Sequence, residues 1–188
     1  MQAALSVSRT IDRVSRRLAR VVTWMTLAMV LVGAFNALAR YAGPAVGLSL
    51  SSNAYLELQW YLFSLVFLLG APYTLRSNGH VRVDVLYGSH SVTARAWIDL
   101  VGVLLFLLPF CALACWYSWD YAWISFQDRE WSSDPGGLSR WPIKAVIPLS
   151  FALVGLQGLS EGIKRIAILR GCSPAEVGLE EPPLEGAA

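Results

Sequence analysis

Long apolar runs recur four times along the chain, separated by segments rich in charged or turn-forming residues. A helix needs roughly 20 mainly apolar residues to cross about 30 Å of hydrocarbon. Runs of this length lie at about 21–39, 54–75, 97–123 and 141–163, and their charged residues lie only near their ends. The pattern predicts an all-α integral membrane protein with four transmembrane helices.

The distribution of Lys and Arg predicts how these helices are oriented. Eleven of the 15 basic residues lie before the first span, between the second and third, or after the fourth. Cytoplasmic segments of membrane proteins are enriched in Lys and Arg, so we expect both termini in the cytoplasm (N-in/C-in). A cleavable signal peptide is the alternative for the first run, but 19 apolar residues exceed the usual 7–15.

The segments outside the spans divide the chain into three regions. Residues 1–20 carry Ile11, Val14 and Leu18 at helical spacing among arginines. This predicts a short amphipathic helix on the anionic inner leaflet that leads into the first span and has membrane lipids as partners. Residues 21–170 form the membrane domain. Residues 171–188, rich in Glu and Pro, are predicted to be a disordered cytoplasmic tail.

Several ionisable residues near the span ends are candidate interface or structural residues. Glu57 and Lys144 have opposite charges and similar predicted depth near the outer surface, which suggests an interhelical contact. Asp99 has Arg95 one turn earlier, and Glu161 is followed by Lys164 and Arg165 at i+3 and i+4. Such spacings predict ion pairs on a helix surface.

Composition and motifs exclude several functions. The chain of 188 residues is 55% hydrophobic and only 15% charged, with a net charge of +2, so a nucleic-acid partner is not expected. Cys111, Cys115 and Cys172 form no disulfide framework. The two histidines share one connector, and no metal, cofactor or catalytic motif is present. We therefore expect no cofactor, no enzyme activity and no independent carrier function. The tryptophans of the third span, Trp116, Trp119 and Trp123, are typical of an interfacial belt.

Several short motifs resemble those of the small membrane subunit (DctQ type, or Q component) of tripartite ATP-independent periplasmic (TRAP) transporters. The second span carries ELQWYLF from Glu57 and LGAPYTL from Leu69, and GHVRVD follows from Gly79. Later motifs are AWID from Ala96, DPGGL from Asp134, RWPIK from Arg140 and LQG from Leu156. The resemblance covers about residues 21–170, and its most specific part is the segment with His80, Arg82 and Asp84.

The resemblance implies a supporting role in the bacterial inner membrane. In such systems a periplasmic solute-binding protein captures an organic acid, and a large membrane subunit moves it inward with a sodium gradient. The resemblance implies that the small subunit is a fixed scaffold for the large subunit and helps the binding protein to dock. A stand-alone four-helix structural membrane protein is the alternative. The candidate interface or structural residues are Glu57, Trp60, His80, Arg82, Asp84, Asp99 and Lys144.

Overall fold

The computed structural model describes residues 1–47, 51–79, 87 and 90–179. Its helices are α1 (Gln2–Val46), α2 (Asn53–Arg76), α4 (Val92–Gly102), the π-helix η1 (Val103–Leu107), α5 (Leu108–Gln127) and α6 (Trp141–Leu169). Four helical stretches of the described chain are long and apolar enough to cross a membrane: Gln2–Gly43, Asn53–Arg76, Val92–Gln127 and Trp141–Leu169. The predicted all-α class with four spans is confirmed.

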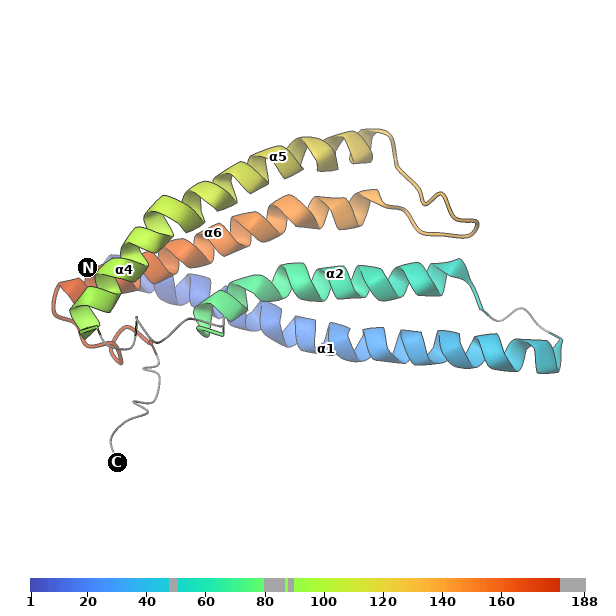
Figure 1. Cartoon of the computed structure of the whole chain (residues 1–188), viewed down its shortest axis with the longest axis horizontal. Coiled ribbons are helices and arrows are strands. Elements are labelled where there is room, and N and C mark those ends of the chain that lie inside the picture. Colours follow the sequence, from blue (N-terminus) through green and yellow to red (C-terminus); the bar gives the residue numbers. More distant parts are fainter. Residues whose placement is uncertain (48–50, 80–86, 88–89, 180–188) are drawn as a thin grey trace, which may run out of the picture.

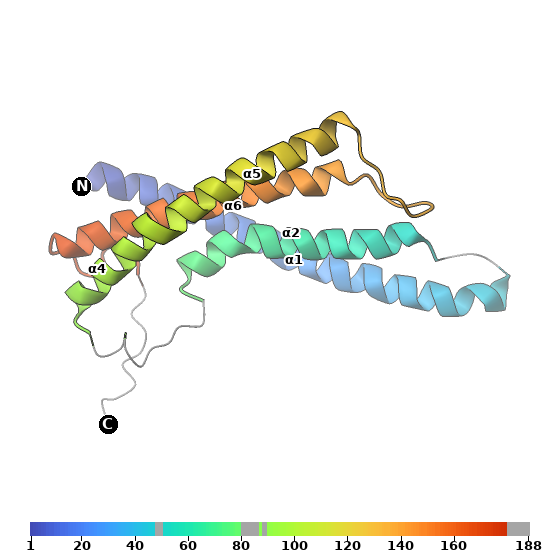
Figure 2. The ribbon, with the colours of Figure 1, turned by 45° about the horizontal axis from the view of Figure 1, so that its top comes forward.

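The helices form two antiparallel hairpins that meet along α6 (Figure 1). One hairpin consists of α1 and α2, and the other of α5 and α6; α6 also contacts α1, α2 and α4. The amino terminus and the described part of the tail, up to Leu179, lie at one end of the bundle (Figures 1 and 2), which we call the terminal end. The opposite end, where α1 connects to α2 and α5 to α6, is the loop end. Because α5 packs chiefly on α6, the bundle is open rather than closed around a core.

Most large apolar side chains are exposed, as a lipid environment requires. Trp24 and Phe106 are each 72% exposed and Phe67 is 69% exposed. In water such a surface would be strongly unfavourable, since burial of apolar area is the main favourable term in folding. A bilayer covers it, so the helices need only a small buried core.

The third span is one continuous run of helix with a widened turn in the middle. In η1 the amide of Leu108 donates to the carbonyl of Val103, five residues back, and Pro109 follows at once. Proline lacks an amide hydrogen and its ring crowds the preceding turn, and π-turns accommodate such local irregularities. The structure thus places the irregular turn immediately before Pro109.

Close packing between α5 and α6 depends on glycines of α6. A Cβ atom added at Gly158 would lie 2.7 Å from Leu107 Cδ2, and one at Gly155 would lie 3.4 Å from Cys111 Cβ. Gly162 faces Val103 in the same way, at 3.6 Å. Small residues at these positions let the two helices approach closely, as is common in membrane bundles.

The structure describes all of the amino-terminal region and the first residues of the tail. Residues 1–20 are not a separate helix, because α1 continues through them without a break. The tail residues up to Leu179 are described, and Val177 is 8% exposed, packed with Ala96, Ala167 and Ile168. Residues 180–188 lie outside the described residues.

Candidate functional site

The charged side chains of the bundle lie towards its two ends. Between them, the middle of each span carries no Asp, Glu, Lys or Arg. In the part of the chain that the structure describes, no three His, Cys, Asp or Glu side chains come together as a metal site would require. The two ends are therefore the candidate functional regions, and they are built differently.

At the loop end, Glu57 fastens the connection between α5 and α6 to the first turns of α2. Its side chain is buried, accepts hydrogen bonds from the Ser132 hydroxyl and the Leu138 amide, and is 4% exposed. One turn later the Tyr61 hydroxyl donates to the Ser139 carbonyl at 2.8 Å. These contacts hold both arms of the connection against α2.

The same connection turns back on itself, and in the turn the backbone of Gly137 lies close to the side chains of Ser132 and Glu57. Trp131 and Ser139 form an antiparallel bridge, and Gly136 between them has a φ of +74°, which favours glycine. At Gly137 an added Cβ would lie 2.4 Å from Ser132 Cβ and 2.8 Å from Glu57 Oε1. The Asp-Pro-Gly-Gly segment from Asp134 thus brings the connection close against Glu57.

Lys144 pairs with Glu130 in the structure, so the predicted contact between Glu57 and Lys144 is wrong. The Lys144 ammonium forms an ion pair with the Glu130 carboxylate and lies 4.2 Å from the centre of the Tyr121 ring. Hydrogen bonds from Lys144 and from the Ser125 hydroxyl hold the pKa of Glu130 below its ordinary value. The sequence placed both charges at one depth but could not show that the loop supplies a nearer carboxylate.

Trp60 lies beside these contacts on the membrane-facing side of α2. It is 42% exposed and its ring meets that of Tyr61 edge-on, with centroids 4.4 Å apart. Together with Tyr121 and Lys144 it lines a cavity of about 240 Å³ over α6. The structure thus brings Trp60 and Lys144 together, with Glu57 close by on the same two turns of α2.

At the terminal end, α1 is joined to α6 by a cluster of buried polar residues. We call this the α1–α6 polar cluster; its members are Ser8, Asp12 and Ser15 of α1 with Gln157, Ser160, Glu161 and Lys164 of α6, all buried. Its centre is Asp12, whose carboxylate lies 2.9 Å from Lys164 Nζ and accepts hydrogen bonds of 2.9 Å from Gln157 and from Ser160.

The remaining polar atoms of this cluster are also satisfied. The Ser15 hydroxyl donates to Gln157 Oε1 at 2.7 Å, and the hydroxyls of Ser8 and Ser160 lie 2.7 Å apart. Lys164 also pairs with Glu161 at 2.7 Å, which confirms the predicted i+3 pair. The pair is not on the helix surface as expected, because Lys164 is only 1% exposed.

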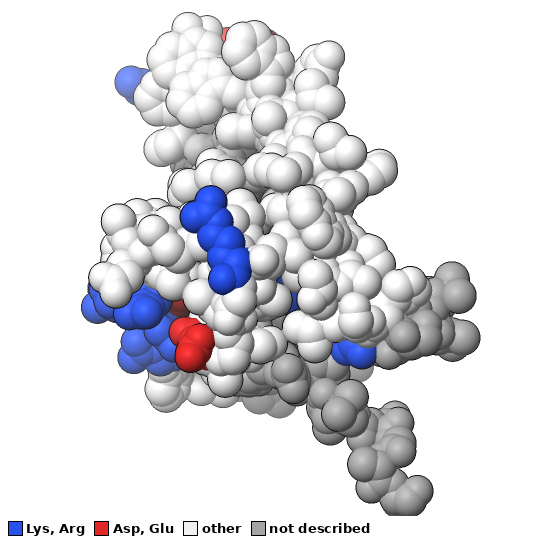
Figure 3. Space-filling view, turned by 90° about the vertical axis from the view of Figure 1, so that its left-hand side faces the viewer, with Lys and Arg blue, Asp and Glu red and all other residues white. Residues whose placement is uncertain are grey.

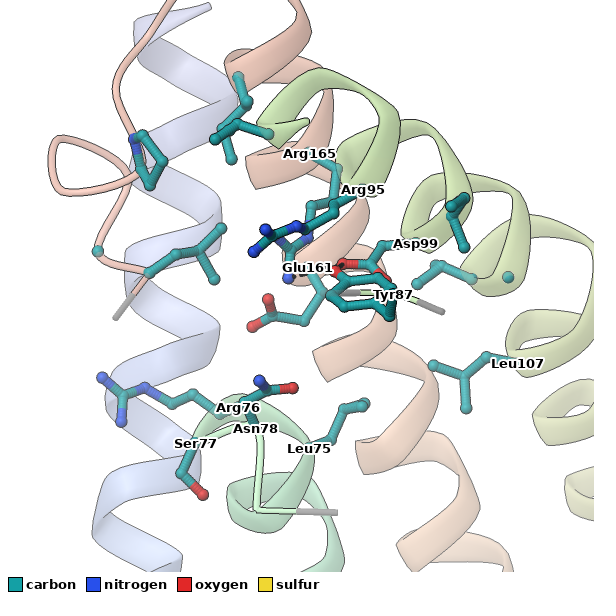
Figure 4. A pocket seen from close by; sticks show the side chains of 18 of the residues that line it. Leu75, Arg76, Ser77, Asn78, Tyr87, Arg95, Asp99, Leu107, Glu161 and Arg165 are labelled. Carbon is teal, nitrogen blue, oxygen red and sulfur yellow. Dashed lines mark hydrogen bonds and ion pairs between the residues drawn. The ribbon is translucent and has the colours of Figure 1, made fainter. Parts of the chain in front are cut away.

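Asp99 lies in a second group at the terminal end, close to the polar cluster. Its carboxylate is 3.0 Å from Arg165 Nη2 and accepts a hydrogen bond of 2.7 Å from the Tyr87 hydroxyl. These residues line a cavity of about 580 Å³ between α2, α4 and α6, with Arg76 on its other side (Figure 4). Arg165, expected to pair with Glu161, therefore joins α6 to α4.

The sequence did not indicate that Ser8, Asp12 and Ser15 of α1 bind α6. Three of the candidate residues from the sequence also lie outside the part of the chain that the structure describes. Asp12 was passed over because the arginines around it dominate the segment, although Ser8, Asp12 and Ser15 share one helix face and could have been found from that spacing. His80, Arg82 and Asp84 lie outside the described residues.

Four spans with polar ends and uncharged centres define a multi-pass helical membrane protein, and comparison with known proteins narrows this class. Residues 29–167 match the family described as the DctQ component of tripartite ATP-independent periplasmic transporters. The chain belongs to this family, whose members are small permease subunits of TRAP transporters. The resemblance seen in the sequence motifs is confirmed.

A characterised relative supports the same assignment. The C4-dicarboxylate TRAP transporter small permease protein DctQ of Pseudomonas aeruginosa is 33% identical over 101 residues. This match covers 50% of the present chain and 45% of the relative, so it spans less than half of that protein's length. No solved structure matches the chain.

Proposed function

We propose that the chain is a fixed scaffold for the large membrane subunit of a sodium-coupled organic-acid uptake system in the bacterial inner membrane. Family membership supports a role within a TRAP transporter. The proposal goes further in assigning the scaffold role, the cytoplasmic position of the terminal end and a docking role for the loop end.

The observation that carries the scaffold role is the lack of charge in the middle of the spans. Ionisable groups within a membrane usually mark a substrate or ion pathway, and here those of the described chain lie near the span ends and are largely tied to structural partners. The open helix order leaves broad apolar faces, for example Leu56, Trp60, Phe63 and Phe67 along α2. Such faces suit lateral packing against a larger helical subunit.

The docking role is supported by how firmly the loop end is held. Glu57 and Tyr61 fix the connection from α5 to α6, and Asn53 Nδ2 donates to the Pro135 carbonyl at 3.1 Å. Trp131 is 65% exposed on this connection. A preorganised surface binds with a smaller entropy loss than a mobile one, so a held loop is suited to receive the soluble binding protein.

Copurification tests the scaffold role. A tagged chain extracted in mild detergent is expected to bring down a large polytopic subunit, and deletion of the chain is expected to abolish organic-acid uptake. Recovery of the chain alone under several mild conditions, with uptake intact in the deletion strain, would contradict the proposal and favour a stand-alone structural protein.

Binding of the solute-loaded binding protein to the reconstituted complex tests docking separately. Trp131→Ala is expected to weaken this binding, whereas Trp116→Ala, which removes an equally exposed tryptophan from the side of α5, is expected to leave it unchanged. Equal binding by the wild type and Trp131→Ala would argue against docking at this connection, while copurification would still test the scaffold.

A further inference from the structure

The amino-terminal part of α1 has three distinct faces, and one of them is buried against other described residues. At about 100° per residue, Ser8, Asp12 and Ser15 share one face, which is the buried one. About a third of a turn away lie Arg9, Arg13, Arg16 and Arg20, all exposed. We call these four residues the arginine ridge. The third face carries Val7, Val14 and Val21, which are 43–55% exposed.

The buried face determines where the arginine ridge points. Asp12 is bonded to Lys164, Gln157 and Ser160, and Ser8 and Ser15 add contacts one turn on either side. These contacts prevent α1 from rotating about its axis, and no proline or glycine interrupts the helix between Ser8 and Val21. The ridge is therefore held in one orientation, on the outside of the bundle.

The arginines of the ridge have no partners among the residues that the structure describes. The ion pairs at the terminal end use Arg76, Lys164 and Arg165, and none of the four ridge side chains forms a hydrogen bond or an ion pair with described residues. Seen from the terminal end, basic side chains gather on the surface with few acidic ones beside them (Figure 3).

Contacts between α1 and α2 show the depth at which the ridge lies. An added Cβ at Gly70 would lie 3.8 Å from Val22 Cγ1, so these two residues are level where α1 and α2 run side by side (Figure 1). The polar end of α2 is Arg76, six residues further on, or about 9 Å at 1.5 Å per residue. The same six residues back along α1 reach Arg16.

Arg16 is therefore level with the polar end of the second span, and the ridge extends to both sides of it. Arg20 lies about 6 Å towards the apolar part and Arg9 about 10 Å away from it. Arginine side chains reach several ångströms along the membrane normal to bring their charge to the headgroup layer. All four guanidinium groups can thus meet the layer of lipid phosphates, and Val7, Val14 and Val21 provide an apolar face beside it.

We propose that the arginine ridge is a binding site for anionic phospholipid headgroups, such as phosphatidylglycerol, in the leaflet at the terminal end. Guanidinium groups bind phosphate oxygens in bidentate fashion, and basic residues at a membrane surface attract anionic lipids. The α1–α6 polar cluster acts as the support that presents the ridge. This proposal does not depend on the transport role, since it concerns the chain and its lipid alone.

Lipid selectivity of the full-length chain tests the proposal. The chain is reconstituted in phosphatidylcholine vesicles with a trace of spin-labelled phosphatidylglycerol or spin-labelled phosphatidylcholine, and the motionally restricted fraction of each label is compared. The wild type is expected to select phosphatidylglycerol severalfold, and this selectivity is expected to fall at high salt because screening weakens exposed charges.

Matched variants locate the effect. Arg13→Gln/Arg16→Gln is expected to lose most of the selectivity, whereas Arg40→Gln/Arg129→Gln, which removes two exposed arginines near the loop end, is expected to keep it. Arg13→Lys/Arg16→Lys retains the charge and is expected to keep part of it, which separates binding from a loss of folding or orientation.

Three results would overturn the proposal. In the first, the wild type shows no preference for phosphatidylglycerol, or its preference does not change with salt. In the second, both glutamine double variants lose the same amount of lipid selectivity. In the third, Arg13→Gln/Arg16→Gln keeps the full selectivity. Loss of a copurifying protein from this last variant, with lipid selectivity unchanged, would show that the ridge binds an acidic protein surface instead.

Discussion

Three charged residues near the ends of the spans pair with partners from other elements. Lys144 of α6 meets Glu130 from the connection before it, Arg165 of α6 meets Asp99 of α4, and Asp12 of α1 meets Lys164 of α6. Taking a charge out of water is costly unless it is paired and hydrogen-bonded. Each pair therefore neutralises two charges and also holds two elements of the chain together at a definite place.

A substitution of Glu57 tests whether this side chain holds the connection between α5 and α6 in place. In Glu57→Gln only one acceptor oxygen remains for the two donors, the Leu138 amide and the Ser132 hydroxyl. The new NH2 group would face either the Leu138 amide hydrogen or the Ser132 hydroxyl, which already accepts a hydrogen bond from the Asp134 amide. We expect the connection between α5 and α6 to loosen, with severalfold faster cleavage by trypsin after the exposed Arg129. Asp134→Asn changes an exposed carboxylate of the same connection and should cleave like the wild type; equal rates in both variants would count against the role of Glu57.

The pair between Glu130 and Lys144 predicts a dependence of stability on pH. The hydrogen bond from Lys144 lowers the pKa of Glu130 below its ordinary 4.5, so the folded state favours the ionised carboxylate. This contribution is present above pH 4.5 and is lost as the pH falls through the lower folded-state value. The difference in Tm between the wild type and Glu130→Gln should be constant near neutral pH and shrink in acid; a difference that grows in acid would contradict the assignment.

At the scale of elements, α6 organises the bundle because it offers different surfaces to different neighbours. Its glycines face η1 and α5, while Gln157, Ser160 and Lys164 face α1. The glycine spacing was visible in the sequence, but without the partner helix it could not be told from conformational flexibility. The polar face was visible as well, but it was interpreted as a helix surface near the membrane boundary.

Packing of α5 on α6 is tested by a pair of glycine variants. Gly158→Ala places a methyl group 2.7 Å from Leu107 Cδ2, whereas Gly102→Ala meets nothing within 4 Å. Overpacking typically costs about 1–3 kcal/mol, and alanine is favoured over glycine in helices by up to about 1 kcal/mol. We expect thermal unfolding in detergent to show a lower Tm for Gly158→Ala and an unchanged or higher Tm for Gly102→Ala. The reverse order would contradict the packing described.

Attachment of the amino-terminal part of α1 is tested by Lys164→Met. The change leaves Asp12 and Glu161 buried without their common cation, and breaking a buried pair costs about 3–5 kcal/mol. We expect a clear loss of stability and faster proteolysis at the arginines of α1. Arg170→Met removes an exposed cation at the end of α6 and should change little. Similar stability of both variants would show that the cluster contributes nothing.

At the scale of the whole molecule, the separation of charge between the two ends defines how the chain should sit in a membrane. The arginines of the amino-terminal part of α1, of the end of α2 and of the end of α6 lie at the terminal end, together with the amino terminus (Figures 1 and 3). The loop end carries far fewer basic residues. Basic residues resist translocation, so the terminal end is expected in the cytoplasm.

Reporter fusions check this orientation directly. Green fluorescent protein fused after Ala188 is expected to fluoresce, since it folds in the cytoplasm, and alkaline phosphatase fused at the same site is expected to be inactive. A phosphatase inserted at the exposed Ser133 of the loop end is expected to be active. Active phosphatase at the carboxyl terminus would reverse the orientation and, with it, the proposed docking role of the loop end.

The sequence by itself determined the number of spans, their approximate limits and the family, because these depend on local quantities. An apolar run of sufficient length is helical in a bilayer whatever surrounds it, since its backbone hydrogen bonds must be satisfied within the segment. The motifs around Glu57 and after Asp134 are equally local. For the same reason the depths of Glu57, Asp99 and Lys144 near the span ends followed from counting residues.

Only the tertiary structure decided which charges meet and which face of α1 is occupied. The partner of a charged side chain depends on how helices cross and on where a connection folds back, and both are set by contacts between residues far apart in the chain, such as Asp12 and Lys164. From depth alone the sequence predicts Glu57 as the partner of Lys144, but the bend of the connection brings Glu130 to Lys144 instead. Contacts between α1 and α6 bury one face of the arginine-rich amino-terminal segment and leave its arginines and valines exposed.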